Sequence, residues 1–256
     1  MGTEIHTCIV IPCYNEEKRF PSEDYISFIE ETPSVLLCFV NDGSTDNTLE
    51  TLNVLKNKYP EKIDIVSYSK NAGKGEAVRQ GFFYCNSRYN FQHIAYLDSD
   101  LSISLQECYG MKKYFSDNVS FCFGSKVKRI GAEIELTAFR YLAGRVIASL
   151  ISRMLGIQVH DTQCGCKLFT KDLSEKLFED KFISKWLFDV EIFFRMLILF
   201  GKTKALDRMK EIPLIRCAYK GGSKVKITYF FRLWLDLTRI NNKYKKLIKA
   251  QKPLYL

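Results

Sequence analysis

Residues 93–100 read His-Ile-Ala-Tyr-Leu-Asp-Ser-Asp, a short apolar run that ends in two acids separated by one residue. The apolar part predicts a buried strand. Residues i and i+2 of an extended strand end point to the same side, so Asp98 and Asp100 can face one cation. Hard divalent ions such as Mg²⁺ or Mn²⁺ take oxygen ligands and share them with phosphates. Because acidic pairs are also common in ordinary loops, the neighbouring sequence decides between a metal site and a surface turn.

Three apolar runs before residue 93 have the same pattern, an apolar segment followed by a polar turn. Each expected strand is short, apolar and followed by a polar turn, and the segments between the strands have helical patterns. The expected strands are residues 8–11, 35–40 and 63–67, and the expected helices are residues 22–31, 46–58 and 75–85. This alternation predicts an α/β fold with βαβ units on a parallel sheet. Ligands of such sheets bind beyond the carboxyl ends of the strands, where we expect the polar turns to converge.

The alternation weakens after Ser104. Further expected elements are a strand at residues 121–126 and helices at residues 137–155, 185–200 and 228–249. The last helix combines aromatic residues with regularly spaced cations. We therefore predict two parts, an α/β domain at residues 1–225 and a basic amphipathic C-terminal helix at residues 226–256.

Charge is distributed unevenly along the chain, whose formal net charge is +9. Residues 201–256 carry 15 Lys or Arg against three acids, whereas residues 1–200 carry 23 against 26. A basic tail attracts an anionic partner such as a membrane surface, a phosphorylated substrate or nucleic acid, although a solvated basic face has the same composition. No recognised nucleic-acid-binding pattern is present, so we expect no nucleic-acid partner.

The cysteines and the apolar runs indicate the cellular location of the protein. Nine cysteines are scattered without a CxxC pair, which favours reduced core thiols over disulfides or a zinc site. The sequence has no charged-then-apolar leader, and no apolar run approaches the roughly 18–20 residues of a membrane span. We expect a cytoplasmic protein that is peripheral at the inner face of a membrane.

Two glycine-containing turns carry further ligand-binding patterns. In Asn41-Asp42-Gly43-Ser44, Asp42 can accept hydrogen bonds from a ligand, although these residue types also favour turns for local reasons. In residues 71–75, Asn-Ala-Gly-Lys-Gly, the glycines permit close approach of the backbone and Lys74 offers a charge to phosphate. The second turn matches neither the P-loop nor the Rossmann fingerprint, which argues against an ATPase or an NAD-dependent enzyme.

The segments IPCYNE (11–16), FVNDGSTDNT (39–48), NAGKGEAVRQGF (71–82) and YLDSD (96–100), in this order, resemble the donor-binding half of family 2 glycosyltransferases. Later segments resemble the dolichyl-phosphate β-glucosyltransferase branch of that family, also called polyprenyl-phosphate glycosyltransferases. They are HDTQCGCKLF (160–169), WLFDVE (186–191) and Gly222-Ser223-Lys224.

This resemblance implies a GT-A-like fold, a mostly parallel sheet flanked by helices, with amphipathic helices at the C-terminus. It also implies an inverting, metal-dependent transfer of a hexose, glucose in this branch, from a UDP-sugar to a polyprenyl phosphate. The implied nucleotide-sugar-binding residues are Pro12, Tyr14, Glu16, Asp42, Lys74 and Asp98. Asp100, together with Asp98, is the implied ligand of Mg²⁺ or Mn²⁺ and acts on the leaving diphosphate.

The chemistry of the acceptor indicates which residues would act on it. An ionised lipid phosphate needs no general base, whereas a hydroxyl acceptor needs one, for which Asp189 is the best candidate. Cations that suit the acceptor phosphate, or that simply lie at the surface, are Lys126, Arg129, Arg140 and Arg145, with Arg140 first among them. The helices at residues 137–155 and 228–249 suit a membrane interface, a dimer face or a cover over the sheet.

Three other functions stay open at this point. A family 2 transferase can act on a saccharide hydroxyl in capsule or cell-wall glycan synthesis. A nucleotidyltransferase is a weaker alternative. A non-catalytic nucleotide-sugar or lipid-binding module is the alternative from another class, and the intact Asp98 and Asp100 pair argues against it.

Overall fold

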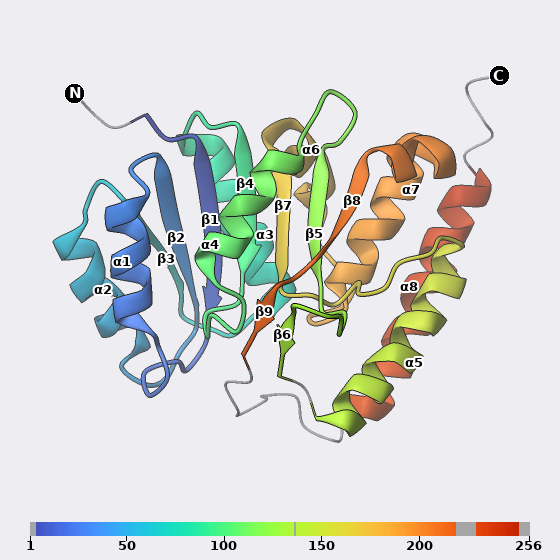
Figure 1. Cartoon of the computed structure of the whole chain (residues 1–256), viewed down its shortest axis with the longest axis horizontal. Helices are drawn as coiled ribbons and strands as arrows, with labels where there is room; N and C mark the ends of the chain where they lie inside the picture. The colour runs from blue at the N-terminus through green and yellow to red at the C-terminus, as the bar shows by residue number, and fades with distance from the viewer. Residues whose placement is uncertain (1–3, 136, 219–228, 251–256) are drawn as a thin grey trace.

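The computed structural model describes residues 4–135, 137–218 and 229–250, without the side chains of residues 138–140 and 229–232. A seven-stranded sheet runs in the order β3-β2-β1-β4-β7-β5-β8, and a two-stranded sheet pairs β6 with β9 (Figure 1). The strands are β1 (Thr7–Cys13), β2 (Val35–Asp42), β3 (Ile63–Tyr68), β4 (His93–Leu97), β5 (Phe121–Ser125), β6 (Glu133–Ile134), β7 (Cys166–Thr170), β8 (Met209–Pro213) and β9 (Arg216–Cys217).

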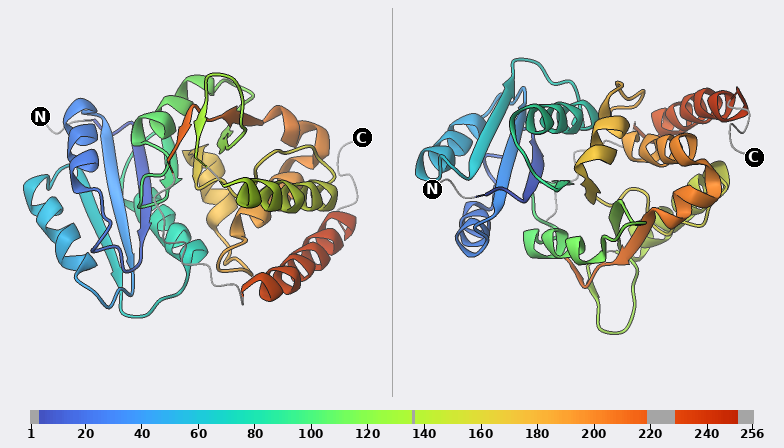
Figure 2. Two further views of the ribbon diagram at one scale, coloured as in Figure 1. Left: turned by 60° about the horizontal axis from the view of Figure 1, so that its bottom comes forward. Right: turned by 90° about the horizontal axis from the view of Figure 1, so that it is seen from above.

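Helices cover both faces of the large sheet. They are α1 (Ser22–Glu31), α2 (Thr48–Lys58), α3 (Lys74–Arg88), α4 (Leu105–Gly110), α5 (Ala138–Leu155), α6 (Lys171–Phe178), α7 (Phe188–Asp207) and α8 (Tyr229–Ala250), with a 3-10 turn, η1, at Met111–Tyr114. One apolar core lies between the sheet and α1, α2 and α4, and a second lies between the sheet and α3, α6 and α7. The two views in Figure 2 show these layers on either side of the sheet.

The α/β fold predicted from the sequence is confirmed, and all five expected strands and six expected helices are present, with ends that agree within three residues except for one. The helix expected at residues 185–200 is α7, which continues past a non-helical Gly201 to Asp207. The sheet is mostly parallel because β7 alone is antiparallel to its neighbours, β4 and β5. The sequence pattern did not predict β7 as a strand. Its residues, Cys-Lys-Leu-Phe-Thr, include a fully buried lysine that hides the apolar character of the segment.

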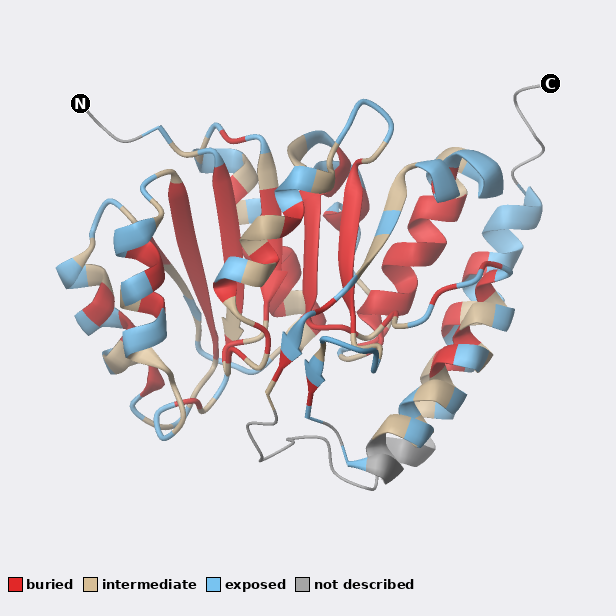
Figure 3. Cartoon of the chain, in the orientation of Figure 1, coloured by how far each residue is buried: buried red, intermediate tan, exposed pale blue. Residues whose placement is uncertain are grey.

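Burial follows from the position of each strand in the sheet. The central strands are covered on both faces and are buried almost throughout, as the red strands in Figure 3 show. Most of their residues are apolar, as expected for strands buried on both faces. All nine cysteines are reduced and buried, as expected for core thiols. Within the described residues, no helix is long and apolar enough to cross a membrane.

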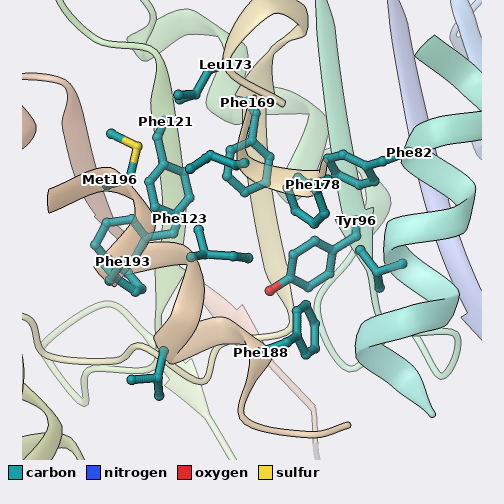
Figure 4. Close-up of a cluster of buried hydrophobic side chains, with 14 of the residues drawn as sticks. Phe82, Tyr96, Phe121, Phe123, Phe169, Leu173, Phe178, Phe188, Phe193 and Met196 are labelled. Carbon is teal, nitrogen blue, oxygen red and sulfur yellow. The ribbon is translucent and has the colours of Figure 1, made fainter. Parts of the chain in front are cut away.

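Aromatic rings fill the core on the α3, α6 and α7 side (Figure 4). Phe82 of α3 stacks on Phe178 of α6 with ring centroids 4.0 Å apart. Phe121 stacks on Phe169 across the antiparallel β5–β7 pair at 4.6 Å. Because aromatic side chains bury large apolar areas, this cluster ties the helices of one face to the middle of the sheet.

The carboxyl-terminal helix α8 packs on α7 through one face. Leu237, Ile240 and Tyr244 are buried there. The Tyr244 hydroxyl donates to the buried Glu191 carboxylate at 3.0 Å and accepts from Arg195 of α7 at 3.0 Å. The described part of α8 is therefore joined to α7 by buried apolar and polar contacts.

Gly81 sets how closely α3 approaches the sheet. A Cβ at this position would lie 2.4 Å from Val10 and 2.8 Å from Val40, both buried on neighbouring strands. Valine side chains have little rotational freedom, so the helix or the strands would have to move.

We therefore expect Gly81→Ala to lower the free energy of unfolding by about 1–3 kcal/mol, although alanine is the better helix former. Denaturant unfolding measures this change. Gly110→Ala is the matched control, because Gly110 is also helical and no atom lies within 4 Å of its added Cβ. Equal stability of the two variants would contradict the close approach of α3.

Candidate active site

The first two βα loops are joined by hydrogen bonds beyond the carboxyl ends of β1 and β2. The Asn15 amide donates to the Ser44 hydroxyl at 3.0 Å, and the Asn15 side-chain oxygen accepts from the Thr45 amide at 2.8 Å. The Glu16 amide donates to the Thr48 hydroxyl at 2.7 Å. Two of the predicted nucleotide-sugar residues frame this region: Pro12 lies in β1, paired with β2, and Tyr14 is 36% exposed.

Asp42 connects the second loop to the third. Its two carboxylate oxygens accept from the backbone amides of Ala72 and Gly73 at 2.7 and 2.9 Å. Burial raises the pKa of Asp42 above its usual value, while these hydrogen bonds act in the opposite direction. Gly73 adopts a φ of 101°, and an added Cβ would lie 2.7 Å from the Lys185 side chain. Asp42 thereby shapes the turn that places Lys74 at the start of α3.

Lys74 and Asp98 form an ion pair at the sheet edge, with 2.5 Å between Lys74 Nζ and Asp98 Oδ1. Burial acts to lower the pKa of Lys74, but attraction to Asp98 and Asp189 outweighs it and raises the pKa. The Asp98 side chain is 37% exposed, so its carboxylate also faces the solvent. The ion pair therefore offers both a carboxylate and an ammonium group to a ligand.

Asp98 contacts the turn that precedes β7. Its amide donates to the Gly165 carbonyl at 3.1 Å. A Cβ on Gly165 would lie 2.0 Å from Asp98 Oδ2, so only glycine leaves room for the carboxylate in this position.

Asp100 lies beside Asp98 at the end of β4. Its Oδ1 accepts from the Ser102 amide at 3.0 Å, and its Oδ2 lies 4.0 Å from Arg19 Nη1. Arg19 is held by Glu16, whose two carboxylate oxygens accept from Arg19 Nε and, at 2.9 Å, from Nη2. Glu16 is 4% exposed, so it contributes to this edge mainly through Arg19.

A buried ion pair lies beneath the edge. Lys167 of β7, which is fully buried, donates to Asp189 Oδ1 at 2.6 Å and to the carbonyls of Thr162 and Cys164 at 3.0 and 2.8 Å. The Tyr96 hydroxyl also donates to Asp189 Oδ1. Asp189 is 3% exposed, and its Oδ1 accepts from both a lysine and a tyrosine.

Two of the predicted acceptor-side cations, Lys126 and Arg145, contact the loop between α5 and β7. Lys126 Nζ pairs with Asp161 Oδ2 at 3.1 Å, and Arg145 of α5 donates to the His160 carbonyl at 2.9 Å. Arg129 is exposed and lies 3.5 Å from the Pro213 carbonyl. The Arg140 side chain and the segment Gly222-Ser223-Lys224 lie outside the described residues.

The sheet edge therefore brings together Asp42, Lys74, Asp98 and Asp100, and it adds groups that the sequence reasoning did not single out. These are Arg19, Tyr96, Gly165 and Lys167. Lys167 gave the clearest signal, since a lysine inside an apolar run such as Cys-Lys-Leu-Phe indicates a buried, paired charge. Arg19 gave none, because a cation in a polar loop has no distinguishing pattern.

The donor set at this edge suits a hard cation that is shared with a phosphate ligand. Mg²⁺ in such sites is held by one or two carboxylates and completed by waters and substrate phosphates. Asp98 and Asp100 supply such a pair. In the part of the chain that the structure describes, no group of three or more His, Cys, Asp or Glu forms a metal cage. The carboxylates fit a cation that arrives with an anionic ligand.

The chain resembles known proteins in sequence. The family model described as "Glycosyl transferase family 2" matches residues 8–178. A dolichyl-phosphate beta-glucosyltransferase of Trichomonas vaginalis is 29% identical over 253 residues, which cover 93% of this chain and 71% of that protein. The protein of the same name from Saccharomyces cerevisiae is 30% identical over 233 residues, covering 82% of this chain and 66% of its own length.

Solved structures resemble the fold. Glucosyl-3-phosphoglycerate synthase from Mycobacterium tuberculosis, crystallised with Mn²⁺, UDP-glucose and phosphoglyceric acid, matches with a TM-score of 0.64 at 17% identity. The match covers 93% of this chain and 80% of that one. This likeness confirms the predicted GT-A-like fold.

The buried Lys167–Asp189 pair generates a prediction. Lys167→Met leaves the Asp189 charge buried without its cation, and we expect a loss of about 3–5 kcal/mol in the free energy of unfolding. The double variant Lys167→Met/Asp189→Asn removes both charges and should be more stable than Lys167→Met alone. Urea unfolding of both variants measures this coupling. Lys176→Met, at an exposed position of α6, serves as the control and should change stability by less than about 0.5 kcal/mol.

Proposed function

Because the chain belongs to glycosyl transferase family 2, we propose that it transfers glucose from a UDP-sugar to a polyprenyl phosphate in an inverting, metal-dependent reaction. As a member of that family the protein is a glycosyltransferase. The finer proposal is carried by one observation: beyond the carboxyl end of β4, Asp98 pairs with Lys74 and Asp100 lies beside Arg19, at the edge where α/β sheets bind their ligands.

The donor proposal rests on the charges of that edge. The Mycobacterium tuberculosis structure was solved with UDP-glucose and Mn²⁺. In this chain, Asp98 and Asp100 would hold the divalent cation, which would offset the charge of the departing diphosphate. Lys74 would contact the phosphates, since it lies 2.5 Å from Asp98. Asp42 and the joined first loops, with Pro12 and Tyr14, would line the nucleoside.

The acceptor proposal rests on relatives and on Asp189. The relatives from Trichomonas vaginalis and Saccharomyces cerevisiae are named for a dolichyl phosphate acceptor. An ionised phosphate needs no general base, whereas a sugar hydroxyl needs one. The Asp189 carboxylate is buried against Lys167 and Tyr96, which supports an acceptor that brings its own charge. We therefore assign Asp189 a positioning role beneath Lys74.

The acceptor phosphate needs cations on the far side of the diphosphate. We propose Lys126 and Arg145 for this contact, together with Arg140 of the same helix. The Lys126 side chain is 24% exposed and paired with Asp161, so it is held near the edge while remaining accessible. Lys126 also lies close enough to act on the pKa of Lys74.

We extend the proposal to the surface on which a lipid acceptor resides. The outer face of α8 carries Trp234 and Leu235, which are 50% and 60% exposed, next to exposed cations such as Arg239 and Lys243. Figure 1 shows that the amino-terminal ends of α5 and α8 extend beyond the sheet at the edge where the parallel strands end. An amphipathic helix of this composition suits the interface of an anionic membrane.

The first test is glucose transfer. Wild-type protein with UDP-glucose, Mn²⁺ or Mg²⁺ and a polyprenyl phosphate should place radiolabelled glucose in an organic-extractable lipid. Asp100→Ala should lower the rate at least about a hundredfold, on the order of 3 kcal/mol of transition-state stabilisation. Asp117→Ala, which removes an exposed acid elsewhere, should leave the rate unchanged.

Other outcomes of this assay would replace the proposal. Label that appears only in water-soluble glycan would support a saccharide hydroxyl as the acceptor. Binding of UDP-glucose without turnover on any acceptor would support a binding module.

The second test is membrane association. We expect Trp234→Ser/Leu235→Ser to weaken binding to vesicles that contain anionic lipid about tenfold, because two exposed apolar side chains no longer enter the interface. Cosedimentation measures the binding, which should also fall as salt rises. The matched control is Val54→Ser/Phe83→Ser, because both residues are 65% exposed on other helices. An equal effect of the two double variants would contradict a specific role of α8.

A further inference from the structure

Arg19 is oriented by a nearly buried carboxylate. Glu16, which is 4% exposed, accepts from Arg19 Nε and Nη2 in a two-pronged arrangement, and its backbone carbonyl accepts from the Arg19 amide at 2.9 Å. Because the guanidinium group is planar, two bonds to one carboxylate determine where Nη1 lies. Nη1 is directed toward Asp100 Oδ2, 4.0 Å away.

The two acids of the Asp98-Ser99-Asp100 stretch therefore each lie beside a cation from another segment, Asp98 beside Lys74 at the start of α3 and Asp100 beside Arg19. Lys74 Nζ is 2.5 Å from Asp98, and Arg19 Nη1 is 4.0 Å from Asp100. The two contacts differ in closeness: the lysine forms a direct ion pair, whereas the arginine lies at the limit of one. Both the Arg19 and the Asp100 side chains are partly exposed, at 30% and 23%, so a ligand can reach the space beside them.

We propose that Arg19 is a diphosphate-binding residue that exchanges partners when the donor arrives. With the site empty, its Nη1 group offsets the charge of Asp100. With donor and cation bound, the same group contacts a phosphate oxygen of the nucleoside diphosphate, and Asp100 is left to the cation. Glu16 acts as a positioning residue that keeps the guanidinium in place through both states. The inference rests on the proposed function and assigns a further residue to its donor site.

The physical reason is the competition between two positive charges for one carboxylate. Arg19 and a divalent cation carry charge of the same sign and approach the same Asp100 carboxylate, so each weakens the binding of the other. A diphosphate reverses this relation, because it brings its own negative charge and oxygens that accept charge-assisted hydrogen bonds from an arginine. Arg19 should therefore oppose the binding of metal alone and assist the binding of the nucleotide with metal.

The test measures these two opposite effects. Mn²⁺ binding is followed by water-proton relaxation without nucleotide, and UDP binding is followed by calorimetry at saturating Mn²⁺. We expect Arg19→Gln to bind Mn²⁺ alone about threefold more tightly and UDP with Mn²⁺ about tenfold more weakly. Arg19→Lys keeps the charge but not the two-pronged contact, so it should bind Mn²⁺ as the wild type does and UDP more weakly.

Lys18→Gln is the matched control, since it removes the same charge from the exposed neighbouring position. It should leave both affinities within about twofold of the wild-type values. Thermal unfolding reports whether each variant is folded, and Arg19→Lys decides the question if Arg19→Gln does not fold.

The outcomes separate the inference from the proposed function. If the wild type binds UDP with Mn²⁺ and Arg19→Gln matches Lys18→Gln, the exchange at Arg19 is wrong while the donor proposal stands. Changes of the same sign in both affinities would also contradict the exchange. If the wild type binds no UDP with Mn²⁺, the proposed donor fails and the inference falls with it.

Discussion

The backbone contact between Asp98 and Gly165 is the constraint on which the candidate site depends. Strand β7 enters the sheet antiparallel between β4 and β5, and the turn before it passes directly beneath the acidic end of β4. The Asp98 amide bonds the Gly165 carbonyl, and the space that a side chain would need is filled by the Asp98 carboxylate. The position of the acid is thus determined by the backbone of a distant segment.

Charges at this edge are arranged in two layers. The lower layer is buried and internally satisfied: Lys167 bonds Asp189 and two carbonyls, and Asp42 accepts two amides. The upper layer is half exposed and consists of Asp98 and Asp100 beside Lys74 and Arg19. Buried charges are stable only when they are paired, so the lower layer stays in place while the upper layer can exchange partners with a ligand. Such an arrangement suits the transfer of a group from a charged donor.

The residues that we propose for the acceptor phosphate and for the membrane lie on neighbouring helices. Arg145 lies on α5, and the exposed Trp234 and Leu235 lie on α8. Both helices flank α7, whose first turn carries Asp189. The packed helices α5, α7 and α8 therefore connect the buried Asp189 with the face that we propose for the membrane. In this proposal, a lipid phosphate would approach the site from the side on which α5 and α8 lie.

Sequence alone determined the fold class, the order of most elements and the acids at the strand ends, because short apolar runs followed by polar turns depend only on local periodicity. It also made Asp42, Lys74, Asp98 and Asp100 candidate site residues, because each lies in a polar turn that follows an expected strand. Only the tertiary structure decided that β7 is a strand, that Asp189 is buried against Lys167, and that Glu16 is buried and bonded to Arg19. β7 pairs with β4, about 70 residues earlier, and Lys167 lies 22 residues from Asp189, so no local pattern encodes these contacts. Glu16 and Arg19 are only three residues apart, but the burial of Glu16 depends on the packing of other segments around it.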